Sequence, residues 1–277
     1  MKNFKKISII VVLMLMLSTL FTSCEKDKNI NDSNENNQSE FILEQGASIQ
    51  RDFIGVIKNQ ANVPISNATV NIGPKIGLTD AKGVFVIKGA NVKELFAYIE
   101  VSKTGYLKGL KTIVPIQGVN NVSIILLTEN MQALPLNNQI QLLNGVKVTF
   151  NGGFEDATGN VYTGAVNYSM NYIDPASPTI ANEMPGMLLG KTTLDDFEML
   201  QTYGMLHVNL TDATGNSLQI ATGGSAEIRM PISSTLSGTA PATIPLWSFD
   251  EDTGYWVEEG SATKIGNEYV GAVSHFS

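Results

Sequence analysis

The residue with the most distinctive chemistry in this 277-residue chain is its single cysteine, Cys24. It stands directly after Thr22 and Ser23, behind an apolar run that begins at Ile7 and follows three lysines. A basic start, an apolar run shorter than the ~20 residues that span a bilayer, and small residues at the end are typical of a secretory signal peptide. A lone thiol in a secreted chain needs its own explanation. We therefore expect residues 1–23 to be a leader and Cys24 to be chemically modified.

The ending Thr22-Ser23-Cys24 resembles the lipobox of bacterial lipoproteins, in which small residues precede a cysteine that is acylated. Phe21 stands where leucine is usual, as in the relaxed lipoboxes of Bacteroidota lipoproteins. The resemblance implies a lipid on Cys24, and each buried CH₂ of its acyl chains would add about 0.8 kcal/mol to membrane binding. The next four residues, Glu25 to Lys28, resemble the signal that sends such lipoproteins to the outer face of the outer membrane.

Three aromatic residues near the C-terminus could bind a sugar: Trp247, Tyr255 and Trp256. Aromatic rings offer flat apolar faces on which sugars stack, but in neighbouring strands they are more often core residues. Tyr255 and Trp256 are adjacent, so in a strand their side chains point to opposite faces and cannot share one platform. A glycan site that uses these residues and a packing role both stay open.

The acidic segment Asp250-Glu251-Asp252-Thr253-Gly254 resembles the start of a calcium loop. In the EF-hand pattern, however, the position of the bidentate glutamate falls on Ser261, which excludes that kind of site. A calcium site of another kind stays open, and a plain hairpin turn is the favoured interpretation. We predict no metal site in this chain.

The remaining candidates for catalysis are few. The only histidines, His207 and His275, stand outside any HExxH or HxxE pattern, and the chain has no Gly-x-Ser-x-Gly elbow. A hydrolase that uses paired carboxylates is the one enzyme class that the sequence leaves open. We expect no enzyme activity and no cofactor.

The charge balance bears on the partners of the chain. The formal net charge is −8, and loss of residues 1–23 leaves 15 basic and 26 acidic side chains. A chain this acidic repels phosphate backbones, so we expect no nucleic-acid partner. Charged residues make up 16% and aromatic residues 8%, with 25 glycines and 10 prolines, a composition that favours many short strands over long helices.

Changes in composition and hydrophobic pattern along the chain predict four parts: a leader (1–23), a disordered tether (24–49) and two all-β modules of the β-sandwich type (50–128 and 135–277). The tether is rich in Asn, Glu and Gln and cannot bury enough surface to offset its chain entropy. In the first module, short apolar runs predict strands at 53–57, 68–72, 84–87, 97–102, 111–115 and 122–127. Asp80 and Gly83 predict a tight turn, and Gly105-Tyr106 predicts a backbone bend with a packed ring.

Four blocks of the first module carry a resemblance. They are Gly55-Val56, Val63 to Val70, Thr79 to Phe85 and Val101 to Tyr106. In order and spacing they resemble the carboxypeptidase-regulatory-like domain, which implies a transthyretin-like β-sandwich. That domain is a non-catalytic part of certain zinc peptidases, so the resemblance implies no peptidase activity here.

The second module has strand patterns at 146–150, 162–172, 226–230, 244–249, 255–258 and 269–275. The runs 205–210 and 217–220 predict a hairpin, because they flank a turn sequence, and 193–200 predicts a short helical turn capped by Thr193. Turn chemistry is reused: Asp-Ala-Thr-Gly-Asn occurs at Asp156 and again at Asp212.

The run from Pro245 to Gly260, with Met184-Pro185-Gly186, Tyr203-Gly204 and Val273 to Ser277, resembles an extracellular β-rich module. That module also occurs in cartilage intermediate layer proteins, after a similar regulatory-like domain. Related chains continue past this stretch, so C-terminal truncation of the module is an interpretation that stays open.

Together these features predict a non-catalytic lipoprotein of the bacterial outer membrane, lipid-anchored at the cell surface, that acts as a structural or adhesive module. The alternative is a glycan-binding lipoprotein of an outer-membrane nutrient uptake system. Its expected partners are the membrane, through the N-terminal lipid, and a protein or glycan ligand.

Overall fold

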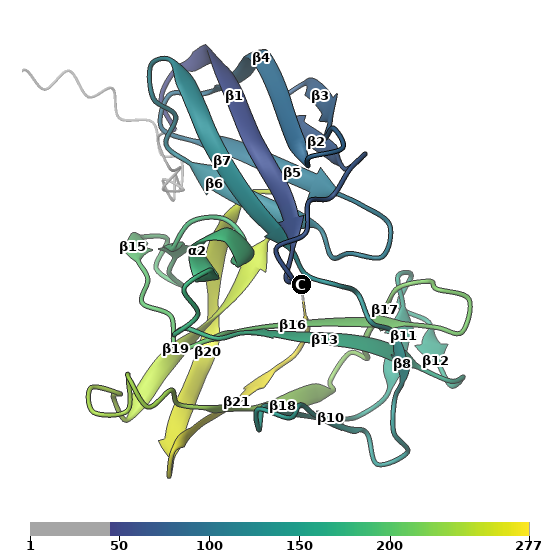
Figure 1. The fold of residues 1–277 in the computed structure, drawn as a ribbon. Helices are drawn as coiled ribbons and strands as arrows, with labels where there is room; N and C mark the ends of the chain where they lie inside the picture. The colour runs from purple at the N-terminus through teal and green to yellow at the C-terminus, as the bar shows by residue number, and fades with distance from the viewer. Residues whose placement is uncertain (1–44, 277) are drawn as a thin grey trace, which may run out of the picture. The chain divides into compact units, whose positions relative to one another are not determined.

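The computed structural model describes residues 45–276, and within them strands dominate (Figure 1). The predicted all-β class is confirmed. The leader, Cys24 and the tether up to residue 44 lie outside the described residues. The first strand begins at Ser48, so the last residues of the predicted tether are already part of a sheet. No helix within residues 45–276 is long and apolar enough to cross a membrane.

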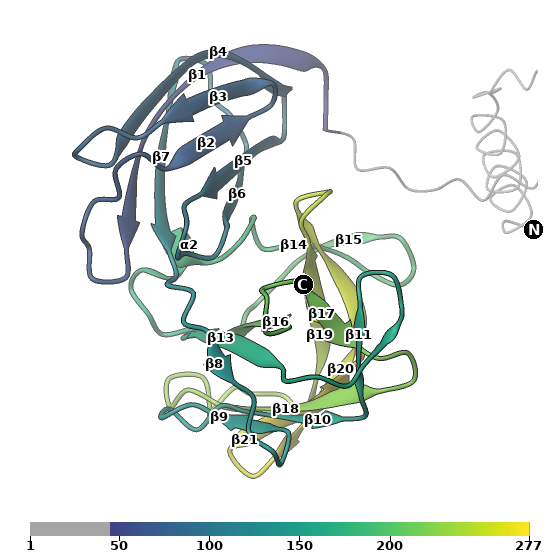
Figure 2. The same ribbon diagram turned by 90° about the vertical axis from the view of Figure 1, so that its right-hand side faces the viewer.

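The first seven strands form two facing sheets, ordered β4-β1-β7 and β3-β2-β5-β6 (Figure 2). Their inner faces carry the apolar residues of each strand, which alternate with exposed ones and close into one core around Phe53, Ile57 and Phe85. The strands are β1 (Ser48–Asn59), β2 (Thr69–Ile72), β3 (Lys75–Leu78), β4 (Val84–Lys93), β5 (Ala97–Ser102), β6 (Gly109–Ile113) and β7 (Val119–Leu126).

The ladders of this module run antiparallel except one. β1 lies between β4 and β7 and pairs with β7 in parallel, from Asp52 opposite Val119 to Asn59 opposite Leu126. The two segments are more than sixty residues apart in the chain, so the central ladder joins the beginning of the module to its end. The strand β3 was missed by the sequence analysis, because Gly77 interrupts its apolar pattern.

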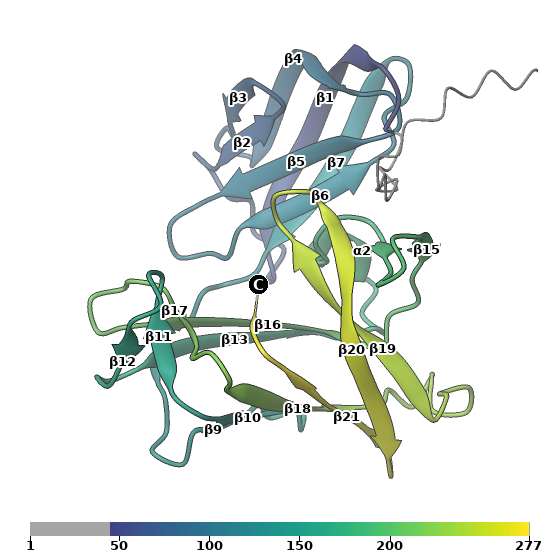
Figure 3. The same ribbon diagram turned by 180° about the vertical axis from the view of Figure 1, so that it is seen from behind.

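The remaining strands build three further sheets, the largest ordered β15-β14-β20-β21-β18-β10-β9 with β19 added on β20 (Figures 1 and 3). The smaller sheets are β16-β13-β8 and β12-β11-β17. The elements are β8 (Gln132–Ala133), β9 (Gln139–Gln141), β10 (Lys147–Asn151), β11 (Phe154–Asp156), β12 (Val161–Tyr162), β13 (Asn167–Ile173), α2 (Ile180–Glu183), β14 (Leu189–Lys191), β15 (Phe197–Met199), β16 (Met205–Thr211), β17 (Leu218–Ile220), β18 (Ser225–Pro231), β19 (Thr243–Asp250), β20 (Tyr255–Ile265) and β21 (Glu268–Val273).

Three local predictions for this part are wrong. The predicted strand 162–172 is broken by Gly164 into β12 and β13. The predicted hairpin of β16 and β17 is reduced to one bridge, Thr211 to Ser217, because β16 pairs with β13 and β17 with β11. The predicted helical turn at 193–200 is a tight turn that leads into β15.

The apolar side chains of residues 133–276 form two clusters. One lies among β10, β16, β18 and β21 and includes Tyr269, which is almost fully buried. The other joins Leu107, Leu110 and Leu127 of the first module to Phe249 and Trp256. The described residues 45–276 accordingly belong to one compact unit.

Candidate functional site

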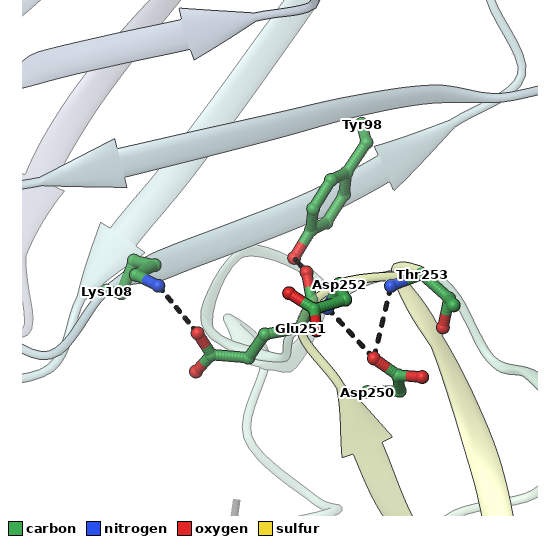
Figure 4. Close-up of polar contacts among 6 residues, drawn as sticks. All are labelled: Tyr98, Lys108, Asp250, Glu251, Asp252 and Thr253. Carbon is green, nitrogen blue, oxygen red and sulfur yellow. Dashed lines mark hydrogen bonds and ion pairs between the residues drawn. The ribbon is translucent and has the colours of Figure 1, made fainter.

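The hairpin turn between β19 and β20 makes polar contacts within itself and with the first module (Figure 4). Asp250 Oδ1 accepts hydrogen bonds from the backbone N–H of Asp252 (2.9 Å) and of Thr253 (3.1 Å), which folds the carboxylate into its own turn. Gly254 closes the turn with a φ of +79°. The hairpin turn favoured by the sequence is thus confirmed, and the carboxylate of Asp250 is engaged in building it.

This turn docks on β5 and β6 of the first module (Figure 4). The Tyr98 hydroxyl donates to the Glu251 carbonyl (2.9 Å), and the buried Thr112 hydroxyl donates to the Gly254 carbonyl (2.9 Å). Lys108 pairs with the Glu251 carboxylate at 2.6 Å, on the exposed side. Three contacts from one turn therefore fix the hairpin against the sandwich.

Gly254 is required by this contact. A Cβ at this position would lie 2.9 Å from Tyr98 Cδ2 and 3.2 Å from Phe96 Cζ. The backbone therefore lies so close to the two aromatic rings that only glycine, which has no Cβ, fits here. The motif Asp-x-Asp-x-Gly is explained by this packing. Residues 45–276 contain no group of three or more His, Cys, Asp or Glu that could hold a metal ion.

Burial and hydrogen bonding shift the pKa values of three side chains at or near this contact. Burial, with the nearby Glu100 and Glu251 carboxylates, raises the pKa of Tyr98, so its hydroxyl stays a donor. The hydrogen bond to Glu251 raises the pKa of Lys108. Burial lowers the pKa of Lys111, whose ammonium donates to the Ala181 carbonyl in α2.

Beneath the turn, Trp256 packs edge-on against Phe249 (5.3 Å between ring centres) in the cluster shared with Leu107 and Leu110. Only 9% of Trp256 is exposed, so it offers no free face to a sugar. Its indole N–H has no hydrogen-bond partner there. The packing role that the sequence analysis left open is the one that the structure gives to Trp256.

Tyr255 lies apart from Trp256, whereas Trp247 and Trp256 line one cavity of the second module. Tyr255 packs edge-on against Phe197 of β15, with 5.1 Å between ring centres, on the face of β20 opposite to Trp256. Trp247 lies over Gly190 and lines a cavity in the second module. The structure therefore does not bring Trp247, Tyr255 and Trp256 onto one surface.

A polar cleft of about 330 Å³ lies beside the docked turn. Tyr106, Lys108, Glu129, Asn209 and Gln219 line it, together with His207. Asn209 donates from Nδ2 to the Glu129 carboxylate at 2.7 Å. Burial lowers the pKa of His207, so its imidazole is neutral near pH 7, and its Nδ1 has no partner within the described residues. Sequence reasoning missed this cleft, because its lining comes from separate segments of both modules, such as 106–108 and 207–210, which only the fold brings together.

Comparison with known proteins gives a distant relationship. No profile of a known family matches this chain. Human cartilage intermediate layer protein 2 is 26% identical over 226 residues, which cover 76% of this chain and 19% of that protein. Pig cartilage intermediate layer protein 1 is 33% identical over 111 residues, 39% of this chain and 18% of that protein. The chain thus spans about a fifth of the length of these relatives, and the predicted resemblance to them is confirmed.

Among solved structures, a Bacteroides fragilis protein of unknown function, inferred to be membrane-associated, aligns with 84% of this chain and 100% of its own. The sequence identity is 10% and the TM-score 0.25. A likeness this low carries no argument about function.

Proposed function

We propose that the chain is a non-catalytic lipoprotein of the bacterial cell envelope, anchored through Cys24, whose two β modules act as one rigid structural or adhesive unit at the cell surface. The docked turn of β19 and β20 carries this proposal. Tyr98, Thr112 and Lys108 hold it by two hydrogen bonds and an ion pair, above an apolar cluster contributed by both modules.

Contacts of this kind suit a protein that transmits or resists force rather than one that opens for a substrate. An interface with a buried apolar core restricts relative motion of the parts it joins. Asp250, the acidic residue most suggestive of chemistry, is committed to its own turn. The similarity to cartilage intermediate layer protein 2, which covers 76% of this chain and so extends into both modules, supports a structural role.

The anchor is tested by fractionation. Cells that express the wild-type chain and the Cys24→Ser variant are labelled with radioactive palmitate and separated into membrane and soluble fractions. We expect label and protein in the outer membrane for the wild type, and unlabelled protein released from it for Cys24→Ser. Protease treatment of intact cells then reports the facing leaflet, and a protein untouched until lysis would refute surface exposure.

Adhesion is tested with the same strains. Wild-type cells should bind an immobilised matrix protein or a second cell, and cells that express Cys24→Ser should lose that binding. Wild-type and deletion strains with equal adhesion and equal envelope integrity would contradict the proposal.

A glycan-binding role is the second candidate, and the polar cleft favours it. Tyr106 supplies a ring, and Glu129, Asn209 and Gln219 supply the carboxylate and amide groups that bind sugar hydroxyls. A glycan array with the wild-type chain and the Tyr106→Ala and Gln219→Ala variants tests this candidate. Binding that both substitutions abolish would support it, whereas an array without hits favours the structural role.

A further inference from the structure

The second module contains a cavity of about 350 Å³ that none of the functions above uses. Its lining comes from the segment 198–206, from β18 and β19, and from the C-terminal residues that follow β21. Figure 3 shows the strands β18, β19 and β21 from behind. Its lining is mostly apolar and includes Met205, Leu206, Met230, Leu246, Trp247 and Phe276. The cavity is open to solvent on one side, and its volume lies in the range of pockets that bind small molecules, about 300–1,000 Å³.

The walls of this cavity are held in place by packing outside it. Tyr203 packs edge-on against Tyr269, with 5.2 Å between ring centres, and the Tyr269 hydroxyl donates to the Pro241 carbonyl at 2.8 Å. Trp247 lies against Gly190, where a Cβ would come within 2.6 Å of its ring. Because aromatic pairs and a close glycine contact fix the walls, the space is part of the native packing.

One end of the cavity is polar. His275 Nε2 lies 2.5 Å from Glu259 Oε1, and both residues belong to the lining. The Glu259 side chain is only 18% exposed, and the His275 imidazole contacts just one of its two carboxylate oxygens. Glu198 adds a second carboxylate to the lining. The polar end therefore accepts hydrogen bonds and favours a donor or a positive charge on a ligand.

We propose that this cavity binds a small amphiphile, an apolar chain or ring with a single hydroxyl or ammonium group directed at Glu259. The apolar lining buries the body of such a molecule, and the carboxylate binds its donor. A sugar fits poorly, because most of its hydroxyls would face carbon without a hydrogen-bond partner. A carboxylate-ended molecule fits poorly, because Glu259 and Glu198 would repel it.

The chain offers an internal reporter for this site. Its two tryptophans, Trp247 and Trp256, both line the cavity, so occupancy should change the intrinsic fluorescence. The full chain is titrated below micellar concentration with 1-octanol, octylamine and octanoate, three probes that share one chain and differ in head group. We expect saturable changes with 1-octanol and octylamine, and at least tenfold weaker binding of octanoate. No saturable change with any probe would overturn the proposal.

Two substitutions test the assignment to this cavity. Glu259→Gln removes the charge and should bring the affinities for octylamine and octanoate to within about threefold of each other. Thr243→Phe places a ring at the exposed edge of the lining and should weaken 1-octanol at least tenfold. The matched control is Thr263→Phe, on the strand position that pairs with Thr243 but outside the lining.

Equal binding of 1-octanol by Thr243→Phe and Thr263→Phe would place the ligand elsewhere and overturn the proposal. An unchanged preference between octylamine and octanoate in Glu259→Gln would overturn the assigned polar end. The proposal does not rest on the lipid anchor or on adhesion, so its failure leaves those proposals untouched.

Discussion

Asp156 and Asp212 open two copies of Asp-Ala-Thr-Gly-Asn, and the structure gives both copies the same hydrogen bonds. In each copy one oxygen of the aspartate carboxylate accepts three hydrogen bonds, from the threonine N–H, the threonine hydroxyl and the asparagine N–H of the motif. The other carboxylate oxygen accepts a hydrogen bond from the side-chain amide of that asparagine. The hydrogen bond from Thr158 contributes most to lowering the pKa of Asp156 to about 2, and that from Asn216 contributes most to lowering the pKa of Asp212 to about 2.

These turns should resist acid. A carboxyl with a lowered folded-state pKa stabilises the protein above its ordinary pKa, and that stabilisation is lost as the pH falls toward 2. We expect Thr158→Val to raise the pKa of Asp156 towards 3.8, measured by carbon-detected NMR titration, while Thr158→Ser keeps it near 2. Asp212 in the same spectrum serves as an unchanged reference. An Asp156 pKa that Thr158→Val leaves in place would refute the role of the hydroxyl.

His207 makes stability depend on pH in the range of histidine titration. Burial lowers its pKa, so the unfolded chain binds a proton at a higher pH than the folded chain does. The free energy of unfolding should therefore fall as the pH drops below about 6.5. His207→Gln should flatten this dependence in urea titrations between pH 7 and pH 5. The same slope in both proteins would show that His207 is not its source.

At the residue scale, the sequence predicted the turns best. Asp80 Oδ1 accepts from the N–H groups of Lys82 and Val84, and Gly83 has a φ of +73°, both as expected. Gly105 has a φ of +85°, and Tyr106 packs on the first core, which confirms the predicted bend and packed ring. Such features depend on a few neighbouring residues, whereas the burial of Trp256 depends on partners more than a hundred residues away.

At the scale of elements, the hairpin of β19 and β20 depends on its hydrogen bonds to the sandwich. Thr112→Val leaves the Gly254 carbonyl without its donor, and the loss of a buried hydrogen bond costs about 1–3 kcal/mol. We expect that loss in the free energy of unfolding from chemical denaturation. Thr263→Val, at an exposed position, should change it by less than about 0.5 kcal/mol. Equal effects of the two substitutions would contradict this role of Thr112.

The middle strand β1 depends on a glycine. A Cβ on Gly55 would lie 2.5 Å from the Phe85 ring and 2.5 Å from the Val122 carbonyl. Gly55→Ala should therefore destabilise the protein by about 1–3 kcal/mol through overpacking. Gly260→Ala is the matched control, because a Cβ in β20 at that position meets nothing within 4 Å. A thermal melt in which both variants match the wild type would contradict the expectation.

The type of an element was predictable where the hydrophobic pattern determines it. The predictions failed where turn residues or the choice of strand partner determine the structure. At the predicted helical turn, the Thr192 hydroxyl accepts from the N–H groups of Leu194 and Asp196, and Asp195 has a φ of +66°. A left-handed residue at this point ends any helix. The predicted hairpin of β16 and β17 failed because pairing partners are chosen across the module.

At the scale of the whole molecule, the shared apolar cluster should make residues 45–276 unfold in one transition. Leu110 is 6% exposed and contacts residues of both modules within the cluster. Leu110→Glu buries a charge there and should split the calorimetric transition into two. Leu78→Glu, at a position that is 61% exposed, should leave a single transition. Two transitions in the wild type would contradict the expectation.

The sequence predicted two β units but not their fusion. Leu107, Leu110 and Leu127 fit the pattern of the first module alone, and Phe249 and Trp256 fit that of the second. Their mutual burial emerges only when the turn at Asp250 to Gly254 meets β5 and β6.

The parallel pairing of β1 with β7 determines when the first module can fold. β1 cannot complete its ladder until Leu126 has been synthesised, so the growing chain carries an incompletely paired strand until nearly half of its 277 residues are made. Contacts between such distant segments raise contact order and slow folding. A holdase that covers β1 until β7 is available would therefore raise the yield of the folded protein more than one that acts on any later strand.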